Sequence, residues 1–162
     1  MQNKVLIVDF GSQYTQLIAR RIRELFIYCE ISPFNNLPED LDEFKAVVLS
    51  GSPFSVNQKD SPNINLEQIL GKTPILAICY GAQLIAKSLN GNVENSNSRE
   101  YGRAKLSFID SNCKLFKNIN HSKTFKKTGC IPATPTHFLN FFIKLVNQSR
   151  DWQGCTVIIS SI

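Results

Sequence analysis

The sequence lacks any apolar run long enough to cross a membrane. A spanning helix needs ~20 consecutive apolar residues, and no run in this chain approaches that length. The first ten residues, MQNKVLIVDF, also lack the small-residue cleavage site of a secretory signal peptide. We therefore expect a cytoplasmic protein that does not use a membrane as a partner.

Paired cysteines are also missing. The chain has an odd number of cysteines and no CxxC pair, which argues against a disulfide framework and against a zinc site. We expect reduced thiols, no metal and no cofactor. The five cysteines are Cys29, Cys79, Cys113, Cys130 and Cys155.

Acidic residues are scarce in the last third of the chain. Residues 111–162 hold seven Lys and Arg against the single Asp151, within a net charge of +5 for the whole protein. A basic cluster can bind nucleic acid, but these lysines belong to no recognisable recognition module. Nucleic-acid binding therefore ranks last among the functions considered, behind a solvated basic segment.

Strand and helix patterns alternate through the first 91 residues. Continuous apolar runs predict strands buried on both faces, and apolar residues at helical spacing predict the helices between them. At 162 residues the chain fits one domain with a real core. We predict an α/β fold whose parallel sheet carries helices on both faces, with ligands at the carboxyl ends of the strands. The predicted strands are 4–10, 27–31, 46–51 and 74–79; the helices are 14–25, 65–71 and 80–90, with Gly91 at the C′ position.

The remaining segments are less regular. Residues 52–65 predict a loop, 103–109 a strand and 138–148 a helix, whereas 111–136 contain no convincing element. We divide the domain into an α/β core (1–116), an irregular basic segment (117–136) and a C-terminal helix with its tail (137–162).

The segment LAICYGAQLIAKSLNG places Cys79 where a buried strand turns into a helix. Hydrolases hold a nucleophile at such a turn, and the N–H of the next residue helps to form an oxyanion hole. The helix N-terminus favours a thiolate, and Gly81 allows a close backbone approach. The alternative is a small buried cysteine that ends a strand.

Several motifs resemble one known family. ICYGAQLIA (78–86) resembles the nucleophile motif of class I glutamine amidotransferases, and VLSGSPFSV (48–56) resembles their oxyanion loop. KVLIVDFGSQYTQLIARRIREL (4–25) and REYGRAKL (99–106) resemble more narrowly the amidotransferase domain of GMP synthase (glutamine-hydrolysing). This collinear resemblance covers residues from about 4 to about 116 and implies a flavodoxin-like fold.

The resemblance implies particular roles. Cys79 attacks the side-chain amide of glutamine and forms a γ-glutamyl thioester with release of ammonia. The Tyr80 N–H and an N–H of the Gly51-Ser52 loop hold the oxyanion, and Gln83 contacts the bound glutamine. Gly11-Ser12-Gln13 either lines this site or forms a plain turn and helix cap.

The chain departs from the family pattern in two places. Ser52 replaces a second glycine, which a backbone donor tolerates only where φ and ψ admit a Cβ. The family's His-Pro-Glu motif, whose histidine is the base and whose glutamate orients it, is absent. Residues 134–152 resemble the helix that follows this motif, so we expect an internal loss that removed late strands. CTVIISSI (155–162) then stands where the family begins a linker to a synthetase domain, and we expect this protein to lack that domain.

Two functions follow from the resemblance. The first is a shortened amidotransferase-like protein, derived from the glutaminase domain of GMP synthase, with impaired or absent glutamine hydrolysis. The alternative is an active glutaminase subunit in purine biosynthesis that supplies ammonia to a separate synthetase. His121 and His137 are the two histidines that could substitute for the missing base. The simpler interpretation of each is a solvent-exposed or helix-capping residue.

Overall fold

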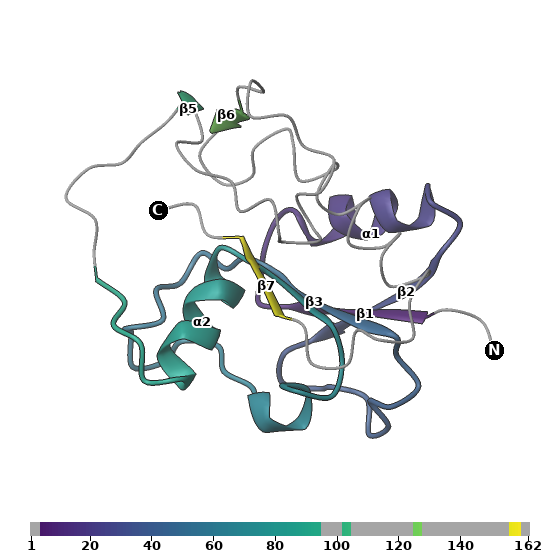
Figure 1. Ribbon diagram of the computed structural model, residues 1–162, viewed down its shortest axis with the longest axis horizontal. Coiled ribbons are helices and arrows are strands. Elements are labelled where there is room, and N and C mark those ends of the chain that lie inside the picture. The colour runs from purple at the N-terminus through teal and green to yellow at the C-terminus, as the bar shows by residue number, and fades with distance from the viewer. Residues whose placement is uncertain (1–3, 95–101, 105–124, 128–155, 160–162) are drawn as a thin grey trace.

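A five-stranded parallel sheet forms the centre of the protein, seen in the computed structural model (Figure 1). The structure describes residues 4–94, 102–104, 125–127 and 156–159. The strand order is β2-β1-β3-β4-β7, which is the flavodoxin-like order when the strands are counted one to five. The predicted α/β fold with an open parallel sheet is therefore confirmed. The strands are β1 (Lys4–Asp9), β2 (Tyr28–Pro33), β3 (Ala46–Leu49), β4 (Ile75–Ile78) and β7 (Thr156–Ile159).

The central strands are buried on both faces because each face carries a helix. Side chains alternate between faces along a strand, so Val5 and Ile7 of β1 join one core cluster while Leu6 and Val8 join the other. Helix α1 (Thr15–Arg23) packs Ile18 and Ile22 into the first cluster. Helix α2 (Tyr80–Ser88) packs against the second. This two-faced burial explains why the strands read as continuous apolar runs.

The end of α2 differs by one residue from its prediction. Asn90 occupies the C′ position with φ +61°, whereas Gly91 is C″. The Asn90 N–H donates to the Lys87 carbonyl (3.1 Å) and the Gly91 N–H to the Ala86 carbonyl (2.7 Å), which is a Schellman motif. Asparagine tolerates the left-handed conformation, and Gly91 is needed because a Cβ there would lie 2.7 Å from the Ala86 oxygen.

The predicted short helix before β4 is a single 3-10 turn, η1 (Leu66–Gln68). Its Asn65 side chain accepts the Glu67 N–H (3.1 Å), and Gly71 reverses the chain afterwards with φ +77°. A turn this short brings Leu66 and Ile69 into the second core cluster. It directly follows the 52–65 loop, which contains no helix or strand, as predicted.

The prediction that residues 155–162 begin a linker is wrong for Thr156–Ile159. These residues form β7, which pairs in parallel with β4 from Ile75↔Thr156 to Ile78↔Ile159. The physical reason is that a short β-branched run finds its partner far away in the sequence, where no local pattern marks it. Within 117–136, Phe125–Lys127 (β6) pairs antiparallel with β5 (Gly102–Ala104), which lies at the start of the strand expected at 103–109. The helix expected at 138–148 lies outside the described residues.

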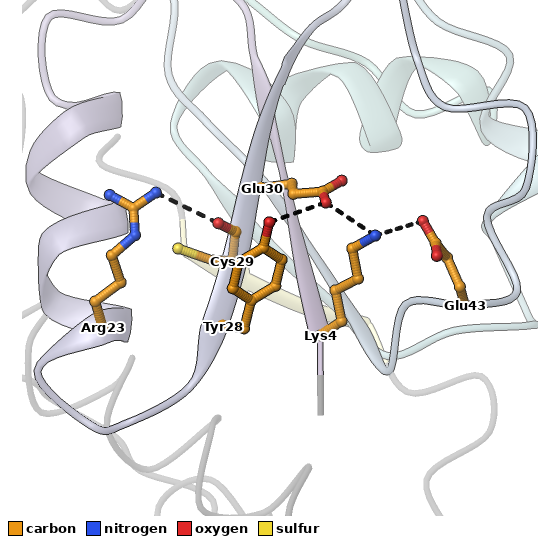
Figure 2. A network of polar contacts seen from close by, with 6 residues as sticks. All are labelled: Lys4, Arg23, Tyr28, Cys29, Glu30 and Glu43. Carbon is orange, nitrogen blue, oxygen red and sulfur yellow. Dashed lines mark hydrogen bonds and ion pairs between the residues drawn. The ribbon is translucent and has the colours of Figure 1, made fainter. Parts of the chain in front are cut away.

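A polar network ties the amino-terminal ends of β1 and β2 together (Figure 2). The Lys4 ammonium forms ion pairs with Glu43 (2.6 Å) and Glu30 (2.9 Å), and it lies 4.6 Å from the centre of the Phe44 ring. The Tyr28 hydroxyl donates to Glu30 (3.2 Å). Lys4 is the first residue of β1, so this network lies at the end of the sheet opposite to the carboxyl ends of the strands.

Candidate active site

Cys79 occupies a strained backbone position between β4 and α2. Its φ of +48° with ψ of −105° lies outside the conformations that residues with a Cβ normally adopt. Such strain persists only where the surrounding structure enforces it, and it is common at functional sites. The residue is half-buried rather than fully buried. The predicted sharp strand-to-helix turn is therefore present.

Gly81 lets α2 start directly against the end of β3. A Cβ on Gly81 would lie 2.6 Å from the Leu49 Cβ and 2.9 Å from the Leu49 oxygen, closer than real contacts allow. The Gly81 N–H donates to the Ser50 carbonyl (3.2 Å). This close contact sets where the helix N-terminus lies relative to the loop that follows β3.

The Gly51-Ser52 loop lies beside the cysteine. A Cβ built on Gly51 would lie 3.9 Å from the Cys79 Cβ and 3.6 Å from the Ser12 hydroxyl oxygen. The φ of Ser52 is not positive, so its backbone conformation admits a side chain. The Ser52 hydroxyl accepts the Phe54 N–H (3.2 Å), which stabilises the turn that follows. The serine therefore fits where the family pattern has glycine.

Tyr80 and Gln83 extend from the same helix start. The Tyr80 ring is buried against Phe10 with 5.3 Å between ring centres, and its hydroxyl donates to the Pro62 carbonyl. Burial raises the pKa of the Tyr80 hydroxyl. Its side chain therefore anchors the 52–65 loop, and its backbone N–H lies in the first turn of α2. Gln83 is half-buried one turn along, and its N–H donates to the Cys79 carbonyl (3.0 Å).

The loop after β1 lies next to the Gly51-Ser52 loop. One Asp9 carboxylate oxygen accepts the Gly11 N–H (2.9 Å), the Ser12 N–H (3.2 Å) and the Thr15 hydroxyl (2.7 Å). The Ser12 hydroxyl accepts the Tyr14 N–H (3.2 Å) and faces the Gly51 position. Ser12 thus forms a turn and also borders the candidate site. Sequence reasoning missed the role of Asp9, although Asp before Gly-Ser at a strand end is a pattern typical of such turns.

The described residues contain no group of three or more potential metal ligands from His, Cys, Asp and Glu. Among these described residues, no helix is long and apolar enough to span a membrane. His121 and His137, the two histidines of the sequence, lie outside the described residues. The site as described therefore consists of Cys79, the backbone donors around it, and the polar groups of three strand ends.

The arrangement suits attack by sulfur on a carbonyl group. Parallel strands bring their carboxyl ends to one edge of the sheet, so the residues after β1, β3 and β4 meet there. A thiol at a helix N-terminus, next to a loop with available backbone N–H groups, can form a tetrahedral adduct with an amide or ester.

Comparison with known proteins identifies relatives of this chain. Residues 6–130 match the profile of the family described as glutamine amidotransferase class-I. GMP synthase (glutamine-hydrolyzing) of Christiangramia forsetii is 63% identical over 122 residues, which cover 75% of this chain and 24% of that protein. GMP synthase (glutamine-hydrolyzing) 1 of Bacteroides thetaiotaomicron is 53% identical over 140 residues, covering 85% of this chain and 28% of that protein. The chain thus spans about a quarter of the length of these curated relatives.

One solved structure shares this fold. This structure, described as a GMP synthase subunit from Thermoplasma acidophilum, superimposes with a TM-score of 0.72 at 21% identity, covering 94% of this chain and 98% of that one. A glutamine amidotransferase from Methylobacillus flagellatus gives a TM-score of 0.55 at 19% identity, covering 74% of this chain and 53% of that one. By its fold and by the match over residues 6–130, this chain belongs to the class I glutamine amidotransferase family and is related to the glutaminase portion of GMP synthase.

Proposed function

We propose that the protein binds glutamine and accepts its γ-glutamyl group on Cys79, with release of ammonia but impaired turnover of the thioester. The observation that carries this proposal is the strained Cys79 backbone, with φ +48°, held beside the Gly51 loop. Strain at a single residue with a nucleophilic side chain, at the carboxyl edge of the sheet, has a ready explanation in catalysis.

The acyl transfer assigns one role to each group. The Cys79 sulfur bonds to the amide carbon, the carbon–nitrogen bond breaks, and the thiol proton leaves with the nitrogen as ammonia. The oxyanion of the tetrahedral intermediate accepts hydrogen bonds from the Tyr80 N–H and from the Gly51-Ser52 loop. Gln83 lies one helical turn after Cys79 and contacts the bound glutamine.

Turnover is impaired because proton transfer lacks its usual residues. Acylation can use the proton of the Cys79 thiol, whereas hydrolysis of the thioester needs an activated water, and general acid–base catalysis contributes about 10²–10⁴-fold to such a step. The 162 residues contain no His-Pro-Glu sequence and only two histidines. We therefore expect an acylated Cys79 to accumulate.

A second function is favoured by one comparison. The Thermoplasma acidophilum protein is described as one subunit of GMP synthase, and this chain covers 98% of it. The alternative is a cytoplasmic glutaminase subunit that passes ammonia to a separate synthetase within purine biosynthesis. It requires sustained ammonia release.

Ammonia release and the mass of Cys79 test both functions. The purified protein is incubated with glutamine, and ammonia and the modified peptide are quantified for wild type, Cys79→Ala and Cys29→Ala. Cys29 is a buried cysteine in β2 and serves as the matched control. We expect about one equivalent of ammonia and a γ-glutamyl adduct on Cys79, lost in Cys79→Ala and retained in Cys29→Ala.

Other results decide against the proposal. Sustained ammonia release that depends on Cys79 would establish the alternative function and overturn impaired turnover. No adduct and no ammonia from wild type, with a glutamine-like chloroketone reacting no faster than iodoacetamide, would overturn glutamine binding itself.

A further inference from the structure

We infer that Ser50 is a positioning residue, whose hydroxyl fixes the direction of the Gly51–Ser52 peptide and so aims the Ser52 N–H at the oxyanion. This inference rests on the proposed function, because it concerns acylation of Cys79 by glutamine. Ser50 directly follows β3 and is fully buried, with 0% of its surface exposed.

The Ser50 hydroxyl forms hydrogen bonds with two neighbours. It accepts the Phe10 N–H at 3.0 Å and donates to the Gly51 carbonyl at 3.0 Å. A hydroxyl has one proton, and here that proton is committed to Gly51. This partly buried hydrogen bond holds the carbonyl in one direction, because breaking it leaves the proton of the buried Ser50 hydroxyl without its acceptor.

The direction of this carbonyl determines the direction of the next N–H. A peptide unit is planar and trans, so the Ser52 N–H points opposite to the Gly51 carbonyl. The carbonyl turns to the Ser50 hydroxyl, which is buried, and the N–H therefore points away from that hydroxyl. Gly51 borders the space beside Cys79, where its absent Cβ would lie 3.9 Å from the Cys79 Cβ. The Ser52 N–H is then available to an oxyanion formed at the sulfur.

The backbone of Ser50 links the second donor to the first. Its N–H donates to the Val8 carbonyl of β1 (3.1 Å), and its carbonyl accepts the Gly81 N–H of α2 (3.2 Å). Gly81 follows Tyr80, whose N–H is the other proposed oxyanion donor. One residue thus fixes the ends of β1 and β3 and the start of α2, so both donors are held relative to the same point.

The acylation rate of Cys79 tests this role. The first equivalent of ammonia and the Cys79 adduct are followed by rapid quench in wild type, Ser50→Ala, Ser50→Thr and Ile22→Val. Loss of one oxyanion donor lowers rates by about 10²–10³-fold, and a misdirected donor should cost Ser50→Ala at least ~10-fold. Ser50→Thr retains the hydroxyl and should recover most of the rate. Ile22→Val, a core change on the opposite face, controls for lost stability.

Reaction of Cys79 with iodoacetamide separates positioning from unfolding. This displacement forms no oxyanion, so Ser50→Ala should react within about twofold of wild type while its acylation falls by the larger factor. Equal losses in both reactions, or acylation at the wild-type rate, would overturn the role of Ser50 alone. Absence of acylation in wild type would overturn the proposed function as well. If Ser50→Ala lacks a cooperative melt, Ser50→Cys replaces it, since a thiol is a weaker donor, with the same outcomes read by peptide mapping.

Discussion

The Cβ of Leu49 lies 2.6 Å from the point where a Cβ on Gly81 would stand. Because Leu49 is fully buried in β3, neither residue can move aside easily. Overpacking of this kind costs about 1–3 kcal/mol. We expect Gly81→Ala to lower the free energy of unfolding by that amount, measured by urea denaturation.

Gly51→Ala is the matched control for that change. A Cβ at Gly51 would meet its nearest atoms at 3.6–4.0 Å, which is ordinary contact, and its φ lies outside the left-handed region. We expect the free energy of unfolding to stay within about 0.5 kcal/mol of the wild-type value or to rise slightly. Acylation by glutamine should slow, because the methyl group fills space beside Cys79. Equal destabilisation by both alanines would contradict the difference in packing.

Backbone strain at Cys79 predicts an inverted order of stability for two variants. Cys79→Ala and Cys79→Gly both remove the sulfur, but only glycine relieves the positive φ. In an ordinary conformation the glycine variant would be less stable than alanine by about 0.5–1 kcal/mol. Here we expect it to be more stable by about 1 kcal/mol. Chemical denaturation of the two variants measures the difference, and an alanine variant at least as stable as glycine would disprove it.

The buried Tyr80 hydroxyl predicts a coupled loss of stability and loop order. In Tyr80→Phe the Pro62 carbonyl loses its donor, and an unsatisfied buried acceptor costs about 1–3 kcal/mol. We expect lower stability and faster proteolysis within residues 52–65. A comparable change on α1, Ile22→Val, should lower stability without exposing that loop. Unchanged proteolysis in Tyr80→Phe would show that the contact does not hold the loop.

The Lys4 network predicts a loss of stability at alkaline pH. Hydrogen bonds to Glu43 and then Glu30 raise the pKa of Lys4. A raised pKa in the folded state means that this stabilisation is complete below the unfolded value and is lost as pH rises through the folded one. The stability difference between wild type and Lys4→Met should therefore be constant at neutral pH and shrink between about pH 9 and pH 12. Lys45→Met, a change at a neighbouring exposed lysine, provides the control. A difference that grows over this range would contradict the sign.

Most of the fold could be predicted because the central strands are buried on both faces. Runs such as VLIV in β1 and ILAI in β4 indicate a parallel sheet with helices on each side. The C-terminal end of α2 was misplaced because glycine was assumed at C′, where asparagine also fits. β7 was missed because a four-residue strand has no periodicity to separate it from a linker, and its partner β4 is far away in the sequence.

The candidate site was predictable only where a motif marks a side chain. Cys79 stands out at the end of an apolar run, and Gly51 and Tyr80 follow from the resemblance. Asp9 bonds within its own turn, and an Asp at a strand end is a local signal that sequence reasoning could have used. Ser50 differs, because its hydroxyl accepts the Phe10 N–H from the end of another strand, and no spacing in the sequence marks such a bond.

The distance of β7 from β4 along the chain has a consequence for biosynthesis. β4 ends at Ile78, yet its outer neighbour begins at Thr156, so the ribosome must translate the whole intervening segment before that edge can be covered. Until then the nascent protein carries four strands with the hydrogen-bonding groups of β4 unpaired, which is a template for other extended chains. Yield in the cell should therefore depend on how quickly translation and chaperones bring the last strand to its place.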